Sequence, residues 1–229
     1  MLKVENTEVF GWEAAIRGMR NPKNSWSKSD SYPAVDCDRC GVIEREGYCK
    51  PKEHNCSQYE CYQIGINDLK LMQNLSKAGN DHAKFLRMIN VTCDIIAPLY
   101  WWKEYDTYKV GTVANSCSTM HKIHTQPINE DAFSFDHVQL CDIGKQYLEE
   151  LEKLRLKFLD TNNKEYWYAL IQLLPESYNQ RRTVQLNYQV LKNMYFSRHN
   201  HKLDEWHTLC NWMLTLPYFK EICVGDTNE

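Results

Sequence analysis

Residues 64–120 decide the fold, and they read IGINDLKLMQNLSKAGNDHAKFLRMINVTCDIIAPLYWWKEYDTYKVGTVANSCSTM. Apolar residues recur at helical spacing in the first part of this stretch, and Gly79 supplies the left-handed residue on which such a helix ends. The side-chain oxygens of Asn67 and Asp68 can accept hydrogen bonds from the first backbone N–H groups of the helix. The pattern therefore predicts a helix that Asn67 and Asp68 cap and that Gly79 ends.

The hydrophobic period changes to two after Gly79. Between Ile89 and Ile95 apolar and polar residues alternate, which is typical of a strand with one buried face. Pro98 cannot donate a hydrogen bond to a sheet, so we expect the strand to end there or to lie at an edge. The apolar run LYWW at residues 99–102 is expected in the core or in a contact between subunits.

Further elements are predicted on both sides of this stretch. A strand and a short helix are predicted within residues 2–19, and a polar loop over residues 24–32. Amphipathic helices are predicted from residue 146, up to residue 174, from Thr183 and over residues 203–216. Asn187 would be the polar member of an otherwise apolar helical face, and we expect it to make a structural hydrogen bond.

The composition is that of a globular chain without a marked charge. The 229 residues carry a formal net charge of −3, and their mean hydropathy is −0.62. This length predicts a single domain over residues 1–229. The near-balanced charge gives no general footprint for nucleic acid, and no apolar run is long enough to span a bilayer. The polar N-terminus lacks a secretory signal, so we expect a cytoplasmic protein with mostly reduced cysteines.

Residues 34–62 form a cysteine-rich insertion in that domain. Half of the ten cysteines of the chain lie in it, together with one histidine: Cys37, Cys40, Cys49, Cys56, Cys61 and His54. A C-x-x-C pair followed by two further cysteines suits tetrahedral zinc, and we assign Cys37, Cys40, Cys49 and Cys56 as ligands. Because five cysteines compete for four positions, a reduced loop without metal, disulfides and an iron–sulfur cluster stay open as alternatives.

The central stretch resembles the flavin-dependent thymidylate synthases, the ThyX family. A helix, Gly79, His82, a strand that ends on Ala97-Pro98, and then Asn115 and Ser118 follow one another in the order of that family.

A second block, residues 169–198, resembles the same family. Leu174-Pro175, Asn187 and Arg198 match its Leu-Pro pair, its helix asparagine and its substrate-activating arginine. The resemblance implies an α+β, ThyX-like fold in which an antiparallel sheet packs with long helices. It also implies a homotetramer that binds FAD and dUMP.

The chain departs from the family at several positions that hold flavin and the nucleotide phosphate. The Arg-His-Arg motif of the family falls on Tyr108-Lys109-Val110, and its next serine falls on Val113. Two further arginines fall on Met120 and Ile171. Lysine does not replace the bidentate clamp that arginine makes on a phosphate. The scaffold is therefore expected to be kept, while the chemistry is open.

The resemblance assigns a role to each remaining polar residue. Arg198 would polarise the uracil ring as the catalytic residue and contact the substrate. Asn115, Ser116 and Ser118 would bind the phosphate of the substrate, with Asn115 also close to the cofactor. His82 would lie near flavin, and Lys109 would lie near flavin or the phosphate. Each has a structural alternative, because Arg198 could cap a helix end and Ser118 could close a local turn.

Other polar residues are weaker candidates. Arg17 or Arg20 could reach the ligand, as an early Ala-Arg segment does in the family, but a solvated arginine is the more common case. His121 and His124 directly follow the candidate site, and solvent-facing histidines are again the more common case.

Two kinds of function follow from these residues. One is a flavin-dependent enzyme that methylates dUMP or a related pyrimidine nucleotide. The alternative is a catalytically inactive protein that binds, sequesters or senses a nucleotide, of the type that phages and mobile elements carry. The altered arginines fit the alternative better, and bound flavin would distinguish the two.

Overall fold

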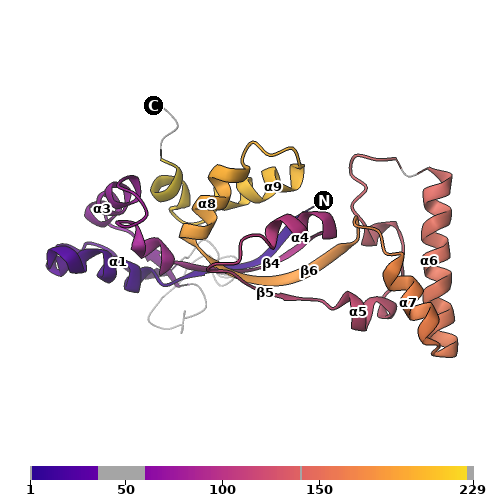
Figure 1. Cartoon of the computed structure of the whole chain (residues 1–229). Coiled ribbons are helices and arrows are strands. Elements are labelled where there is room, and N and C mark those ends of the chain that lie inside the picture. The colour runs from indigo at the N-terminus through magenta and orange to yellow at the C-terminus, as the bar shows by residue number, and fades with distance from the viewer. Residues whose placement is uncertain (1, 36–59, 140, 226–229) are drawn as a thin grey trace, which may run out of the picture. The chain divides into compact units, whose positions relative to one another are not determined.

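The computed structural model describes residues 2–35, 60–139 and 141–225 (Figure 1). The four assigned zinc ligands, Cys37, Cys40, Cys49 and Cys56, lie outside the described residues. The chain divides into two compact units. Unit 1 comprises Met1–Val9 and Val91–Leu216, and unit 2 comprises Phe10–Asn90 and Pro217–Glu229. The single domain expected from chain length stays a prediction.

Unit 1 is built on a four-stranded sheet. Its strands lie in the order β1 (Lys3–Phe10), β4 (Asn90–Pro98), β6 (Asn179–Asn187) and β5 (Val113–Ser116). β5 pairs antiparallel with β6. The helices of unit 1 are α4 (Leu99–Tyr105), α5 (Thr119–Lys122), α6 (Asp142–Thr161), α7 (Lys164–Gln172), α8 (Tyr188–Arg198) and α9 (Asp204–Met213), with short 3₁₀ helices η6 (Ile123–Thr125) and η7 (Glu130–Ala132). The predicted α+β class is confirmed.

Strand β4 has the alternation that the sequence predicts. Val91, Cys93 and Ile95 are at most 1% exposed, while the residues between them are half-buried. The strand ends at Pro98, as expected, and it lies between β1 and β6 rather than at an edge. Strand β4 therefore has one apolar, buried face and one polar, half-buried face.

An aromatic cluster covers the apolar face directly after β4. Trp101 and Trp102 of α4 are at most 1% exposed, and their ring centroids lie 4.9 Å apart. Trp101 also packs at 4.9 Å against Trp206 of α9. The indole N–H of Trp102 donates to the backbone oxygen of Gln180 at 3.0 Å. Both tryptophans thus lie in the core of unit 1, which decides between the two expected locations.

The predicted helix from Thr183 is wrong in its first turn. Thr183 belongs to β6, where Gln180, Val184 and Leu186 are buried at a period of two. The helix begins at Tyr188, and the side chain of Asn187 caps it by accepting a hydrogen bond from the Val190 backbone N–H at 3.1 Å. Val184 and Asn187 are three residues apart, a spacing that fits one face of a helix, which explains the error. Asn187 does make the structural hydrogen bond that we expected.

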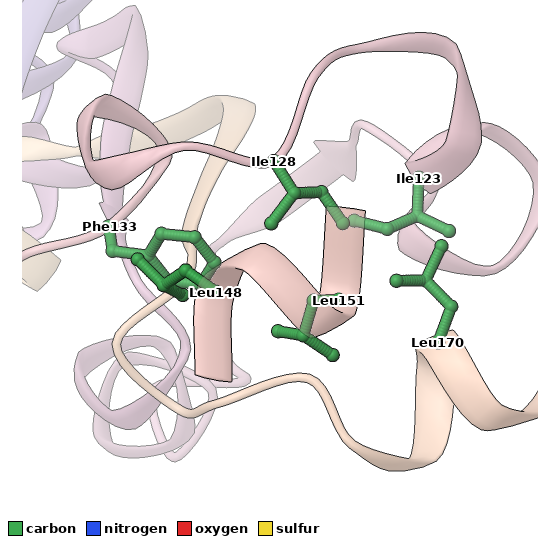
Figure 2. Close-up of a cluster of buried hydrophobic side chains, with 6 residues drawn as sticks. All are labelled: Ile123, Ile128, Phe133, Leu148, Leu151 and Leu170. Atoms are coloured by element: carbon green, nitrogen blue, oxygen red, sulfur yellow. The ribbon is translucent and has the colours of Figure 1, made fainter. Parts of the chain in front are cut away.

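A second hydrophobic core joins the two helices α6 and α7 to the loop before them (Figure 2). Its buried residues are Ile123, Ile128, Phe133, Leu148, Leu151 and Leu170. On the same stripe of α6, Arg155 is 8% exposed and binds Glu152 at 2.6 Å. The amphipathic helices predicted from residue 146 and up to residue 174 correspond to α6 and α7.

Unit 2 contains helices and one pair of short strands. Its elements are α1 (Trp12–Arg20), β2 (Tyr32–Val35), β3 (Glu60–Gln63) and α3 (Ile66–Lys77), with 3₁₀ helices η1 (Asn21–Lys23), η2 (Trp26–Lys28) and η5 (Lys84–Arg87) and a π-helix η8 (Lys220–Val224). β2 and β3 pair antiparallel, with Val35 opposite Glu60. The two ends of the cysteine-rich insertion therefore lie side by side.

The start of α3 is capped from outside the helix. Asp30 accepts hydrogen bonds from the backbone N–H groups of Asn67 at 2.9 Å and Asp68 at 3.1 Å. The expectation that Asn67 and Asp68 cap the helix is wrong, because both already lie inside it. The predicted stop at Gly79 is confirmed by its φ of +106°, a conformation that a side chain disfavours.

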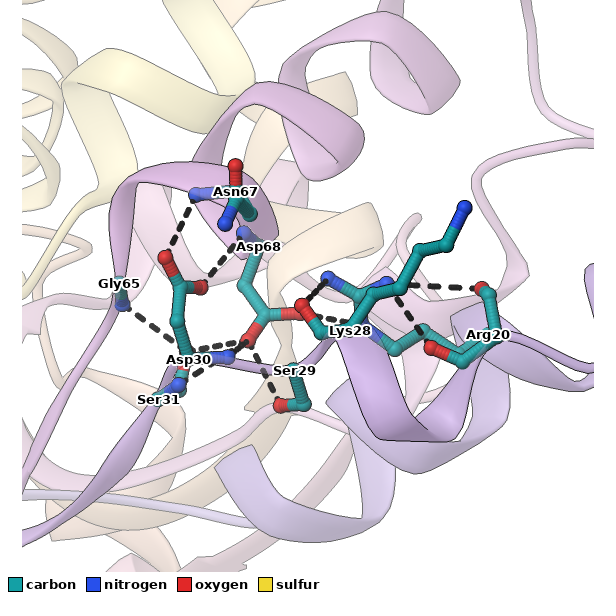
Figure 3. Close-up of polar contacts among 9 residues, drawn as sticks. Arg20, Lys28, Ser29, Asp30, Ser31, Gly65, Asn67 and Asp68 are labelled. Atoms are coloured by element: carbon teal, nitrogen blue, oxygen red, sulfur yellow. Dashed lines mark hydrogen bonds and ion pairs between the residues drawn. The ribbon is translucent and has the colours of Figure 1, made fainter.

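A buried ion pair connects α1 to α3 (Figure 3). Arg20 and Asp68 are 4% and 0% exposed, and Nε lies 2.6 Å from Oδ1. The Arg20 Nη groups also donate to the backbone oxygens of Ser25 and Lys28. The other Asp68 oxygen accepts from the hydroxyls of Ser29 and Ser31 at 2.8 and 2.7 Å. Every charged atom of the pair thus has partners, which burial of charge requires.

The two early arginines therefore have different roles. Arg17 is exposed and lies 3.6 Å from Glu13, as a solvated arginine would. Arg20 is neither solvated nor free for a ligand, because Asp68 and two backbone oxygens occupy its guanidinium.

The Asp68 carboxyl is held in its charged form. Burial by itself would raise the pKa of Asp68, but the hydrogen bonds from Ser31, Ser29 and Arg20 outweigh burial and lower the pKa below its ordinary value. A lowered folded pKa means that this stabilisation is present above the ordinary pKa of the carboxyl and is lost as the pH falls through the folded value.

Replacing Arg20 with alanine is expected to destabilise the protein by about 3–5 kcal/mol, because the Asp68 charge stays buried without its partner. Urea unfolding at pH 7 measures the loss, and the matched variant Arg17→Ala on the same helix is expected to change stability by at most about 0.5 kcal/mol. The difference between the two variants should shrink as the pH falls and Asp68 takes up a proton. Equal stabilities of the two variants at pH 7 would contradict this account of the ion pair.

Candidate functional site

Arg198, the assigned catalytic residue, is the last residue of α8 and belongs to a polar cluster in unit 1. Its Nε donates to the Tyr108 hydroxyl at 2.9 Å, and its Nη1 donates to Glu104 Oε2 at 3.0 Å. The guanidinium carbon lies 4.7 Å from the ring centre of Trp206. The expected alternative, a cap on the helix end, is wrong, because the guanidinium bonds to side chains of other segments. We call Glu104, Tyr108, Arg198, His201 and Trp206 the Arg198 cluster.

Glu104 is the centre of the Arg198 cluster. Its Oε2 also accepts from the indole N–H of Trp206 at 2.7 Å and lies 3.4 Å from Nε2 of His201. The Arg198 and Glu104 side chains are 19% and 35% exposed, so the outer edge of the cluster reaches solvent. The pair is therefore accessible to a ligand, yet its charge is already balanced.

Tyr108-Lys109-Val110, which stands in place of Arg-His-Arg, lies in the turn between α4 and β5. Tyr108 is half-buried and Val110 is 89% exposed. Lys109 is exposed and is the one cation of these three residues. Gly111, with a φ of +76°, lets the turn pack closely on α8, since a Cβ there would lie 3.1 Å from Asn187 Nδ2 and Val190 Cγ2. The turn is thus fixed against the helix that carries Arg198.

The assigned phosphate ligands Asn115 and Ser116 lie on strand β5 rather than in a loop. Asn115 is opposite Thr183 and Ser116 is opposite Arg182, so their side chains point to different faces of the sheet. Part of the backbone that the loop would have offered to a phosphate takes part in the β5–β6 ladder instead. The two residues therefore do not form one cradle.

Ser118 makes the local turn that was its structural alternative. Its hydroxyl oxygen accepts a hydrogen bond from the His121 backbone N–H at 3.0 Å and caps the four-residue helix α5. The side chain is half-buried. Ser118 can still donate its hydroxyl proton, but its position is set by the helix start.

The polar face of the sheet gathers charged residues that the sequence did not single out. Asp94 accepts hydrogen bonds from Thr183 at 2.6 Å and Asn6 at 2.9 Å, and its carboxylate lies 3.4 Å from Arg181. Hydrogen bonds from Thr183 and Asn6 hold the pKa of Asp94 below its ordinary value. Arg181 also contacts Glu5 at 2.5 Å. Asn115 shares this face through its partner Thr183.

Arg182 is a second cation that sequence reasoning missed. Its guanidinium carbon lies 4.2 Å from the Trp102 ring centre, and Nη1 bonds to Asp106 at 2.7 Å. The side chain is 15% exposed and is the partner of Ser116 across the ladder. The sequence signal that could have revealed Arg182 is the arginine pair at residues 181–182. Once the surrounding residues are recognised as alternating with a period of two, the pair indicates a strand that carries charged side chains.

The assigned histidine ligand belongs to the other unit. His82 is exposed in the turn after α3 of unit 2, where its backbone N–H donates to Gly79 at 3.0 Å.

The two later histidines do not act as a pair. His121 is exposed, while His124 packs edge-on against Phe158 at 4.9 Å.

Among residues 2–35, 60–139 and 141–225, no group of three His, Cys, Asp or Glu side chains could hold a metal. No helix in the described ranges is long and apolar enough to cross a membrane.

No protein-family model and no curated protein matches this sequence. Two solved structures of the flavin-dependent thymidylate synthase ThyX from Helicobacter pylori, both in complex with FAD and dUMP, match with a TM-score of 0.67 at 16% sequence identity. The matches cover 96% and 97% of this chain and 97% of theirs. The chain therefore has the fold of flavin-dependent thymidylate synthase ThyX across nearly its whole length.

Proposed function

We propose that this protein binds a pyrimidine nucleotide of the dUMP class on a ThyX scaffold. The observation that carries the proposal is the likeness in fold over 96% of the chain to the Helicobacter pylori enzyme, which was solved with FAD and dUMP. A fold by itself does not specify a ligand, so the proposal needs residues that can contact one.

Arg198 is the residue we propose to contact the nucleotide. Its guanidinium rests on Trp206, and two of its N–H groups are engaged by Tyr108 and Glu104. Within the described part of the chain its Nη2 has no hydrogen-bond partner, so donors remain for a uracil oxygen or a phosphate. Lys109, next to Tyr108 in the chain, would add a second positive charge, and Asn115, Ser116 and Ser118 stay proposed substrate contacts.

The residues present do not fit the diphosphate of FAD as arginines would. The three residues Tyr108, Lys109 and Val110 supply one cation, and the Tyr108 hydroxyl is already engaged by Arg198. A single lysine offers a point charge without a bidentate fork. The proposed binding of FAD, with His82, Lys109 and Asn115 as contacts, therefore rests on the likeness in fold.

Two candidate activities follow. Methylation of dUMP with FAD is the activity that the fold favours. Binding, sequestering or sensing a nucleotide without catalysis is the second candidate, and it is favoured by Val110 at an arginine position and by the neutralised charge of Arg198.

Zinc in the cysteine-rich insertion is a separate proposal. It rests on the spacing of Cys37, Cys40, Cys49 and Cys56 and on the β2–β3 pair, which brings the flanking residues together. A homotetramer and a cytoplasmic location are likewise proposals.

Replacing Arg198 with alanine is expected to weaken dUMP binding at least about tenfold without unfolding the chain, because a charge-assisted contact is lost. Isothermal titration with dUMP measures the affinity, and circular dichroism checks the fold. Lys202→Ala is the matched control, since it removes the same charge from an exposed residue shortly after α8. Unchanged affinity in Arg198→Ala, or no dUMP binding by the wild type, would refute the proposed role.

Visible absorbance of the purified protein, before and after FAD is added, separates the two candidate activities. Near-stoichiometric flavin is expected if the protein methylates dUMP, and a colourless protein that still binds dUMP would leave the binding function.

Zinc measured on the same sample is expected at about one ion per chain if the four cysteines form a tetrahedral site. A sample without zinc would remove that site.

Light scattering is expected to give a mass of four chains of 27.1 kDa each. The solution mass tests the proposed homotetramer directly. A monomer at micromolar concentration would count against any ligand site shared between subunits.

A further inference from the structure

The guanidinium of Arg198 is held on two of its three nitrogens. Nε donates to Tyr108 and Nη1 donates to Glu104, while Trp206 lies under its plane. The described residues leave Nη2 without a hydrogen-bond partner, so its donors remain for a ligand. An arginine fixed in this way loses less side-chain entropy when it binds an anion or a carbonyl oxygen.

Glu104 is itself fixed by a rigid part of the fold. The indole N–H of Trp206 donates to the same carboxylate oxygen at 2.7 Å, and Trp206 is 0% exposed. Behind it, Trp206 packs against Trp101 at 4.9 Å, and α8 packs against α9 (Figure 1). The aromatic core therefore sets the position of the Glu104 carboxylate, and the carboxylate in turn fixes the Arg198 guanidinium.

We propose that Glu104 is a positioning residue for Arg198: its carboxylate, anchored by Trp206, orients the guanidinium so that Nη2 meets the nucleotide. This inference rests on the proposed function, in which Arg198 contacts the ligand. It adds a residue that the ThyX resemblance did not assign and that sequence reasoning did not single out. Tyr108 supports the same orientation through Nε.

A purely structural role for Glu104 makes a different prediction. If Glu104 only joined α4 to α9 through Trp206, its replacement would lower stability in any background and would affect Arg198 no more than other residues. If it positions Arg198, its effect on the ligand must disappear when Arg198 is changed. A double-mutant cycle separates these roles.

The central variant is Glu104→Gln, which keeps the size of the side chain and an oxygen for Trp206 but removes the charge. We expect dUMP affinity, measured by titration calorimetry, to fall roughly tenfold, because a neutral amide holds the Arg198 guanidinium less strongly than a charged carboxylate does. In the Arg198→Lys background, Glu104→Gln is expected to cause no further loss. Glu176→Gln is the matched control, because Glu176 pairs at 2.7 Å with Lys103, the residue next to Glu104 in the chain, and the same negative charge is removed outside the Arg198 cluster.

A second readout needs no nucleotide. The Arg198 Nε–H resonance, assigned by its absence in Arg198→Lys, is expected to be visible and slowly exchanging in the wild type and to broaden or vanish in Glu104→Gln. An unchanged Nε–H signal, or an equal affinity loss in both backgrounds, would overturn the inference. If Glu104→Gln does not fold, Tyr108→Phe, which removes the other acceptor of Arg198, must show the same loss and the same dependence on Arg198.

The two readouts also keep the inference apart from the proposed function. If the wild type does not bind dUMP, and the Nε–H signal that it shows is lost in Glu104→Gln, the proposed function is refuted and the positioning role is supported. A wild type whose affinity depends on Arg198 but not on Glu104 would support the function and end the positioning.

Discussion

The burial of Trp101 and Trp102 on the apolar face of the sheet is the constraint on which unit 1 depends. Trp102 donates to the backbone of β6 and lies under Arg182, while Trp101 packs against Trp206 of α9. One short helix thereby joins the sheet to the C-terminal helices. Glu104 and Tyr108 follow these tryptophans closely in the chain. The same packing therefore places both residues beside Arg198.

Charge compensation shapes the candidate site as much as packing does. Three arginines of unit 1 contact carboxylates. Arg181 contacts Glu5 and Asp94, Arg182 contacts Asp106, and Arg198 contacts Glu104. An anionic ligand would compete with these carboxylates or share the guanidinium donors that they leave. Such a surface would recognise a ligand through the fixed directions of its hydrogen-bond donors more than through its net charge, which agrees with the small net charge of the chain.

Unit 2 shows the same principle in a buried setting. Arg20 and Asp68 connect α1 to α3, and the neighbouring Asp30 supplies the cap that α3 lacks in its own sequence. The partners are 37 to 48 residues apart in the chain, so neither the ion pair nor the cap could be assigned from local sequence. Their hydrogen bonds also hold the stretch from Ser29 to Ser31 that leads into β2.

The sequence by itself determined the elements whose patterns are local. The alternation of β4, the stop at Gly79 and the stripe of α6 depend on local sequence patterns, and the structure has all three. Tertiary structure alone decided where Arg20 and Arg198 find their carboxylates, that Asn187 begins a helix instead of lying within it, and that Asn115 and Ser116 face opposite ways. The physical reason is that strand register and the pairing of charges join residues distant in sequence, and no local period encodes such a partner.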